Sequence, residues 1–227
     1  MTPEEAVKLS LGEYGDKLRE VALREPKWAF RFARDVDKRM REDTKEAAEK
    51  EPLYAFFYAY DITKKPEDEV RVKCLSCPTL AFNYAWEIDK APRDDTRTAA
   101  SKDPTLAVDY ARCVDKKPHV ITRKGACAKP ETALRYALLV EGPNDITRKA
   151  ACHSPSLALD YMLRVDFGEH AVTRTAVAGT SFEEDYDLLL ANLTEEIAKN
   201  EIEGALWNKW RVMVRPSEKK IFLAQGS

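Results

Sequence analysis

A proline recurs about every 26 residues through most of this 227-residue chain. Each one opens the same phrase, P-x-x-A-x-x-Y-A-x-x-V-D-K, and a single step in the series is shortened to 25 residues. The prolines are Pro26, Pro52, Pro78, Pro104, Pro130 and Pro155. The chain is therefore an internal repeat, and it must fold as stacked copies of one small unit.

Each unit is predicted to contain two helices. Counted from the proline, apolar residues at the third, sixth, seventh and tenth positions share one helical face, and the proline itself suits the first helical turn. A second proline, such as Pro92 or Pro118, ends this helix, and a shorter helical phrase such as 95–102 follows. One unit is too short to bury its own apolar face, so neighbouring units must stack.

Two rows of residues are predicted to form the interior. One row is small in every unit: Ala22, Ala48, Cys74, Ala100, Ala126, Ala151 and Val177. The other row is aromatic: Phe32, Tyr58, Tyr84, Tyr110, Tyr136 and Tyr161. The pattern weakens after Ser181, where Asp187 is expected at the aromatic position.

We therefore expect an all-α, right-handed α-solenoid of about six to seven helix-pair repeats in residues 1–180, with a degenerate first unit. Residues 181–227 are expected to form a divergent C-terminal capping region packed on the array. Weak alternation on both sides of Pro216, within residues 211–223, is typical of a short β-hairpin.

Two phrases of the repeat resemble known helical repeats. Val70-Arg71 with Cys74, and Thr96-Arg97 with Ala99-Ala100, resemble the V-R-x-x-A-A phrase of HEAT repeats and of the leucine-rich-repeat variant. The phrase at 51–61, EPLYAFFYAYD, is similar to P-x-x-A-Y-x-Y-A repeats in proteins of large tailed phages and giant viruses. The likeness covers roughly residues 15 to 180 and implies a scaffold, with a viral protein acting on a host factor as one form of it.

Composition and motifs narrow the function. The chain has 37 basic and 39 acidic side chains, so no bulk field draws it to nucleic acid or to a membrane. It lacks a glycine-rich phosphate loop and the common zinc and nucleophile motifs, and its one C-x-x-C pair, Cys74 and Cys77, has no further ligands at zinc spacing. We expect no enzyme activity, no cofactor and no metal site.

The ends and the cysteines predict a compartment. The chain shows no signal-peptide pattern after Met1 and no apolar run long enough to span a membrane, and its five cysteines are expected to be reduced. The expected location is the cytoplasm, which is the host cytoplasm if the chain is viral.

The most variable row of the repeat is the candidate partner-binding site. It stands eight residues after each proline, and Trp, Tyr and Arg often carry interface energy. Its members are Arg34, Tyr60, Trp86, Arg112, Leu138 and Leu163, of which the first four are the predicted contacts. The alternative is that this row packs against a neighbouring second helix.

A basic column recurs once per unit and has two interpretations. Its members are Arg19, Lys45, Arg71, Arg97, Arg123, Arg148 and Arg174. The column would form a structural ladder with acidic residues at the first-helix ends, namely Asp37, Asp89, Asp115, Glu141 and Asp166. Alternatively, it would track the phosphates of a nucleic acid.

The last candidate is an acidic segment after the repeats, which begins with Glu183, Glu184, Asp185 and Asp187. Such a segment suits the solvated face of a capping helix, or a site that docks a basic partner or imitates nucleic acid. Taken together, the sequence predicts a non-enzymatic scaffold or binding protein with a macromolecular, mainly protein, partner. The alternative is a nucleic-acid-binding repeat protein that uses the basic column.

Overall fold

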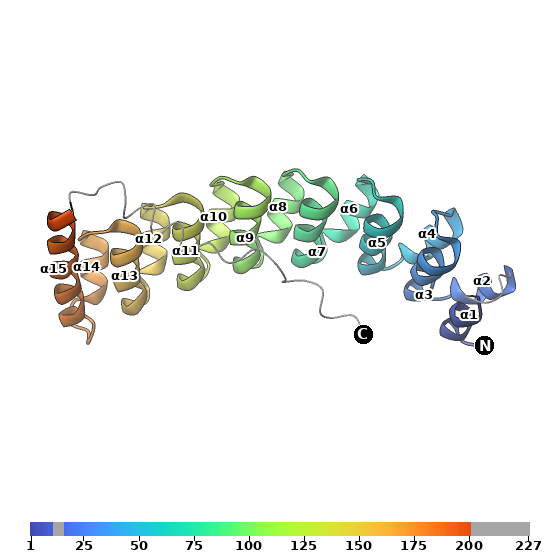
Figure 1. Ribbon diagram of the computed structural model, residues 1–227, viewed down its shortest axis with the longest axis horizontal. Helices are drawn as coiled ribbons and strands as arrows, with labels where there is room; N and C mark the ends of the chain where they lie inside the picture. The colour runs from blue at the N-terminus through green and yellow to red at the C-terminus, as the bar shows by residue number, and fades with distance from the viewer. Residues whose placement is uncertain (11–15, 201–227) are drawn as a thin grey trace.

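The chain forms an all-α solenoid of stacked helix pairs. The computed structural model describes residues 1–10 and 16–200, and these residues form helices and no strand. The helices follow one another along a shallow arc from α1 at one end to α15 at the other (Figure 1). The predicted all-α repeat architecture is confirmed, whereas the hairpin predicted at 211–223 lies outside the described residues.

The first helix of each unit begins at the repeating proline and changes to a π-helical segment in its last turns. In chain order these elements are α3 (Pro26–Arg31) with η1 (Phe32–Asp37), α5 (Pro52–Tyr58) with η2 (Ala59–Thr63), α7 (Pro78–Asn83) with η3 (Tyr84–Asp89), α9 (Pro104–Tyr110) with η4 (Ala111–Asp115), α11 (Pro130–Tyr136) with η5 (Ala137–Glu141), and α13 (Pro155–Tyr161) with η6 (Met162–Asp166).

The second helices are short and regular. They are α4 (Glu42–Ala48), α6 (Asp68–Cys74), α8 (Asp94–Ala100), α10 (Val120–Ala126), α12 (Asp145–Ala151) and α14 (Ala171–Val177). A further pair, α1 (Pro3–Ser10) and α2 (Asp16–Ala22), precedes them, and α15 (Glu183–Asn200) follows α14.

The chain reverses between the two helices of a unit through one residue of positive φ. Lys38, Lys64, Lys90 and Lys116 hold this position with φ between 51° and 54°. Gly142 takes it in the unit that is one residue shorter, with φ 79° and ψ −155°. Only glycine adopts that conformation without strain, so Gly142 lets the shorter turn close.

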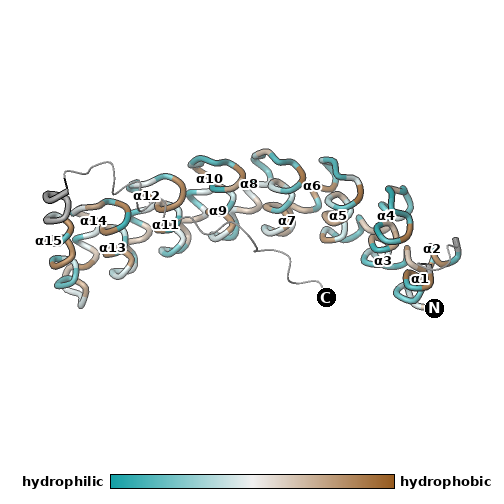
Figure 2. The backbone as a smooth tube through the Cα atoms, in the orientation of Figure 1, coloured by the Kyte–Doolittle hydropathy of each residue, from teal (hydrophilic) through white to brown (hydrophobic). Residues whose placement is uncertain are grey.

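The units stack in two layers. Each first helix lies against the first helices of its neighbours, as α7 does between α5 and α9, and second helices such as α8 and α10 also lie side by side. Hydrophobic residues recur in every unit along the tube (Figure 2). The row of small residues from Ala22 to Val177 is fully buried, which lets the helices approach closely.

Tyrosine hydroxyls tie each unit to the one before it. The Tyr110 hydroxyl accepts a hydrogen bond from the backbone N–H of Arg93 at 3.1 Å and donates to the Arg93 carbonyl at 3.2 Å. The Thr96 hydroxyl lies 2.8 Å from it. Arg93 is the N-cap residue immediately before α8, so the tyrosine binds backbone groups at that helix start. The same contact joins Tyr58 to Arg41, Tyr84 to Glu67, Tyr136 to His119 and Tyr161 to Asn144.

The aromatic row continues into α15, which corrects the expectation that Asp187 holds its seventh position. Tyr186 is fully buried there among Ala158, Met162 and Val177. Its hydroxyl lies 2.8 Å from the Thr173 hydroxyl, as in the earlier units. Thr173 and Tyr186 are 13 residues apart, whereas the threonine and tyrosine of the earlier units are 14 apart. Counting with the earlier spacing therefore placed Asp187 in the row.

The substitution Tyr110→Phe should destabilise the protein by about 1–3 kcal/mol, because it leaves the backbone N–H of Arg93 without its hydrogen-bond partner. Thr96→Val should cost less, since Val70 stands at the equivalent place beside Tyr84 and the Tyr84 hydroxyl still binds Glu67. Urea unfolding followed by circular dichroism compares the two. Equal losses would contradict this role of the tyrosine.

Candidate protein-binding surface

The predicted partner-binding row lies on the π-helical segments. Arg34, Tyr60, Trp86 and Arg112 are exposed on η1, η2, η3 and η4, and these segments adjoin one another in order. The side chains of Tyr60 and Trp86 remain 44% and 41% exposed. The two leucines of the row, Leu138 and Leu163, are half-buried. The row is therefore a surface strip at its first four positions.

Each of the first three side chains in this strip rests on a buried aromatic ring of the same helix. The rings of Phe56 and Tyr60 stack with centroids 5.9 Å apart, and those of Phe82 and Trp86 are 5.4 Å apart. The Arg34 guanidinium lies 5.2 Å from the centre of the Phe30 ring. These supports restrict the exposed side chains before any partner arrives, which lowers the entropy lost on binding.

The basic column faces carboxylates of the next unit rather than open solvent. Arg97 donates to Asp115 from Nη2 at 2.7 Å and from Nε at 3.1 Å, and Arg148 makes a two-pronged contact with Asp166 at 2.7 and 2.8 Å. Arg19 contacts Asp37 in the same way, and Arg123 contacts Glu141. In these four pairs the acidic partner lies 18 residues further along the chain.

The other members of the column find different acidic partners. Lys45 donates to Glu67 at 2.6 Å, because Thr63 stands where the other units have a carboxylate. Arg174 contacts Glu169 at 2.7 Å and also binds Asp187 of α15. The guanidinium groups of Arg97, Arg148 and Arg174 also lie over the rings of Tyr110, Tyr161 and Tyr186.

The contact between Arg71 and Asp89 is the exception in the ladder. Arg71 Nη1 is 3.9 Å from Asp89, while Arg71 Nε donates to Asp95 at 3.0 Å. Asp95 competes with Asp89 for Arg71. The equivalent residues opposite Arg97 and Arg148 are Ile121 and Val172, which carry no charge and cannot compete in this way. The Asp89 side chain is 1% exposed and neither of its oxygens accepts a hydrogen bond, although Arg93 Nε lies 3.3 Å away. Burial therefore raises the pKa of Asp89.

The acidic residues after Ser181 divide into two groups. The Glu183 carboxylate accepts from the backbone N–H of Gly179 at 2.8 Å, and Asp187 binds Arg174. Glu184 and Asp185 are exposed on the first turns of α15. Two of the four predicted acidic residues thus have local structural partners.

The cysteines and histidines do not assemble a reactive centre in the described part of the chain. Burial raises the pKa of Cys74 to about 12, which keeps it a thiol. His119 and His170 instead accept from backbone N–H groups at the starts of α10 and α14. Across residues 1–10 and 16–200, no three His, Cys, Asp or Glu side chains are grouped as metal ligands.

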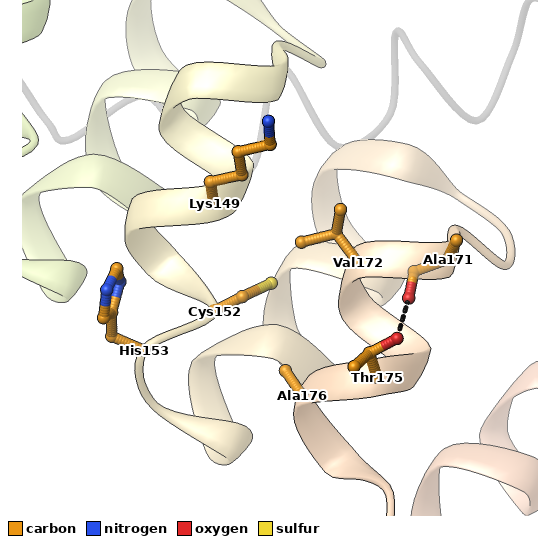
Figure 3. Close-up of a pocket in the computed structure, with 7 residues that line it drawn as sticks. All are labelled: Lys149, Cys152, His153, Ala171, Val172, Thr175 and Ala176. Atoms are coloured by element: carbon orange, nitrogen blue, oxygen red, sulfur yellow. Dashed lines mark hydrogen bonds between the residues drawn. The ribbon is translucent and has the colours of Figure 1, made fainter.

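A hollow of about 480 Å³ lies between α12 and α14. Figure 3 shows Cys152 pointing towards Val172 and Ala176, while His153 lies on the far side of the α12 backbone. Burial raises the pKa of Cys152 to about 11, so it offers no thiolate, and His153 does not face it. The lining of the hollow is mostly apolar, although Lys149, His153 and Thr175 also belong to it.

Comparisons with known proteins found no match. This holds for protein-family models, for curated proteins and for solved structures. Among the described helices, none combines the length and the apolar character that crossing a membrane requires.

Two features of the surface escape reasoning from sequence. The aromatic supports under Tyr60 and Trp86 are signalled only by Phe56 and Phe82 four residues earlier, a spacing that also fits plain core packing. The departure of Arg71 from Asp89 is signalled by Asp95, which lies 24 residues after Arg71. The presence of Asp95 in the sequence was the signal from which this departure could have been predicted.

The substitution Asp115→Ala should destabilise the protein by about 3–5 kcal/mol, because it leaves the buried Arg97 guanidinium without its main partner. The paired change Arg97→Leu with Asp115→Leu should recover much of that loss, since no charge is then left buried. A double-mutant cycle in urea measures both. Asp115→Ala with less effect than an exposed control, Lys102→Ala, would contradict a structural ladder.

Asp89 should make the stability of the protein fall as pH rises, which is the opposite of what a carboxylate in an ion pair usually does. Its pKa in the fold lies above the ordinary value of 3.8, so its stabilising contribution is complete below that value and is lost as pH rises through the raised pKa. Asp89→Asn should therefore be more stable than the wild type at neutral pH, and the difference should vanish near pH 3.8. Unfolding at several pH values tests this. Asp115→Asn is the control, and it should destabilise at neutral pH.

Proposed function

We propose that this chain is a non-enzymatic binding protein that presents the strip Arg34, Tyr60, Trp86 and Arg112 to a protein partner. The observation that carries the proposal is the exposure of Tyr60 and Trp86, each held against a buried ring of its own helix. Large aromatic side chains that stay in solvent on a rigid support are typical anchors of protein interfaces.

The repeat gives this strip its setting. The small row, the tyrosine row and the ladder serve the stacking of units and stay nearly constant, whereas the strip changes from unit to unit. Four neighbouring π segments place an arginine, a tyrosine, a tryptophan and a second arginine in a line. A partner that contacts these four side chains in order would be selected by their identity rather than by the fold.

The proposal assigns the basic column to structure rather than to nucleic acid. A phosphate track needs cationic groups that face solvent. Arg71, Arg97 and Arg148 are each 6% exposed and already engage carboxylates. Binding of nucleic acid by this column would require these contacts to break.

The proposal also includes a relationship and a location. The P-x-x-A-x-x-Y-A phrase and the V-R-x-x-A-A-like phrase support kinship with HEAT-like arrays and with repeats of phage and giant-virus proteins. The composition supports action in a cytoplasm, on a host factor if the chain is viral. These points rest on the sequence alone.

The triple change Tyr60→Ala, Trp86→Ala and Arg112→Ala should abolish capture of the partner, because each anchor contributes about 2 kcal/mol or more to such an interface. The measurement is quantitative mass spectrometry of proteins captured from native cytoplasm, followed by calorimetry with the purified candidate. The melting temperature should stay close to that of the wild type.

The matched control is Lys50→Ala with Lys102→Ala, which removes exposed side chains at the turns before α5 and α9. Capture by this control should equal that of the wild type. Unchanged capture by the triple variant would refute the assignment of the strip.

A further inference from the structure

The turns that follow the first four π segments, η1 to η4, are strongly basic. They comprise residues 38–41, 64–67, 90–93 and 116–119. Their one acidic residue, Glu67, binds Lys45. Their nine basic residues are Lys38, Arg39, Arg41, Lys64, Lys65, Lys90, Arg93, Lys116 and Lys117. The turns at the other ends of the same second helices contain three basic and three acidic residues, so the excess of positive charge lies on one side of the array.

Most of these basic side chains are not engaged by the fold. Arg41 contacts Asp43 at 3.6 Å, and Arg93 contacts Asp89 at 3.3 Å. The other seven are exposed, and within the described part of the chain they have no carboxylate at ion-pair distance. They are Lys38, Arg39, Lys64, Lys65, Lys90, Lys116 and Lys117.

Acidic residues at the starts of the second helices do not balance this charge. Asp68 and Asp94 are already bound to Arg71 and Arg97 of the ladder. α10 has no acid in its first turn. Among the described residues at these helix starts, only Glu42 and Glu69 are exposed acids outside an ion pair, against seven exposed cations.

Stacking sets the seven cations in a file. A lysine follows the end of each π segment, and η1, η2, η3 and η4 lie against one another in order. Packed helices are about 10 Å apart, so the four lysine positions extend over about 30 Å. In three of the turns a second exposed cation follows at once, namely Arg39, Lys65 and Lys117. We refer to these seven side chains as the basic edge.

The fold does not require lysine at these places. A positive φ favours glycine or asparagine, yet four lysines adopt it with φ between 51° and 54°. A cation at the end of a helix gains from the helix dipole, but the last two units use Gly142 and Phe167 there. The repeated lysines, and the cations that follow them, therefore indicate a ligand rather than a need of the fold.

We propose that the basic edge binds the phosphate backbone of a single-stranded nucleic acid. The edge repeats one charged side chain at a regular interval, and a nucleic-acid backbone repeats one charge at a regular interval. Contacts to phosphate carry no information about base sequence, so they need no variation from unit to unit. The strip of Arg34, Tyr60, Trp86 and Arg112 does vary, which suits a protein partner instead.

The shape of the edge favours a single strand over a membrane or a duplex. A membrane offers a plane of charge and takes up apolar side chains, whereas the edge is one or two cations wide. In the four turns, all of which the structure describes, Met40 is the one large apolar side chain that is exposed. The backbones of a duplex wind about its axis, so a straight file of about 30 Å meets each strand about once per helical turn. A flexible single strand can follow the whole file.

The basic edge differs from the ladder in being ready to bind. Arg71, Arg97 and Arg148 are each 6% exposed and hold carboxylates, whereas the edge requires no contact to break first. The edge and the protein-binding strip are also separate sets of side chains. The proposal therefore goes beyond the protein-binding function and does not depend on it.

Fluorescence anisotropy of a labelled oligothymidine of about 16 nucleotides tests the proposal. The wild type should bind this oligonucleotide at low salt, and its affinity should fall steeply as salt rises. Each phosphate contact adds about −0.7 to the slope of log affinity against log salt, so seven contacts give a slope of about −5.

The variant with Lys64→Gly, Lys90→Gly and Lys116→Gly removes three cations of the edge. Its affinity should fall about tenfold or more, and its slope should become shallower by about 2. Glycine adopts a positive φ without strain, so the melting temperature should not fall. A loss of binding is then not a loss of the fold.

The matched control is Lys50→Ala with Lys102→Ala and Lys129→Ala, which removes the same charge from exposed turns at the other ends of the second helices. Its affinity should stay within about twofold of the wild type, because salt screens distant charges. An equal loss in the control and the edge variant overturns the proposal, and so does a wild type that fails to bind at low salt. Tighter binding to duplex DNA of the same length, or to phosphatidylserine vesicles, overturns the choice of a single strand.

Discussion

The structure depends on contacts that each unit makes with its neighbour, and the tyrosine hydroxyl is the most regular of them. A single hydroxyl satisfies both backbone groups at the start of the preceding unit's second helix, as Tyr110 does for Arg93. The ladder adds a second link in the same direction, since Arg97 reaches forward to Asp115 while the tyrosine reaches back. Neither link can form within one unit, so stability must be shared along the array.

This sharing divides the residues of a unit into two groups. The small row, the aromatic row and the ladder are fixed by stacking, and a change in any of them is felt by two units at once. The residues on the outward surface of both layers do not take part in stacking and can vary. On the first-helix layer they form the strip with Tyr60 and Trp86, and on the second-helix layer they include the exposed residues Glu69 and Lys149.

The sequence predicted the architecture well because proline spacing and helical periodicity act locally. The second helix expected at 95–102 begins at Asp94, and the small row is buried in every unit. The π segments could not be predicted, because the same residues fit an α-helix and only stacking selects the wider turn. The placing of Asp187 in the aromatic row was wrong, since a register counted from prolines does not detect a one-residue shift after the last proline. At the candidate surface, the exposed positions of Tyr60 and Trp86 followed from the repeat, but the rings beneath them depend on side-chain geometry.

The short turn at Gly142 shows which lengths the array holds constant. The unit that contains it has lost one residue, yet Tyr161 still reaches back 17 residues to Asn144 and Arg148 still reaches forward 18 to Asp166. The turn at Gly142 accommodates the missing residue, and the spacings of the tyrosine contact and of the ladder contact stay the same. Between α9 and α12, where both links are regular, whole units could be duplicated or deleted without disturbing either link. The length of the array is therefore set by the number of units. Chains with more or fewer units would differ in length and keep the same contacts between units.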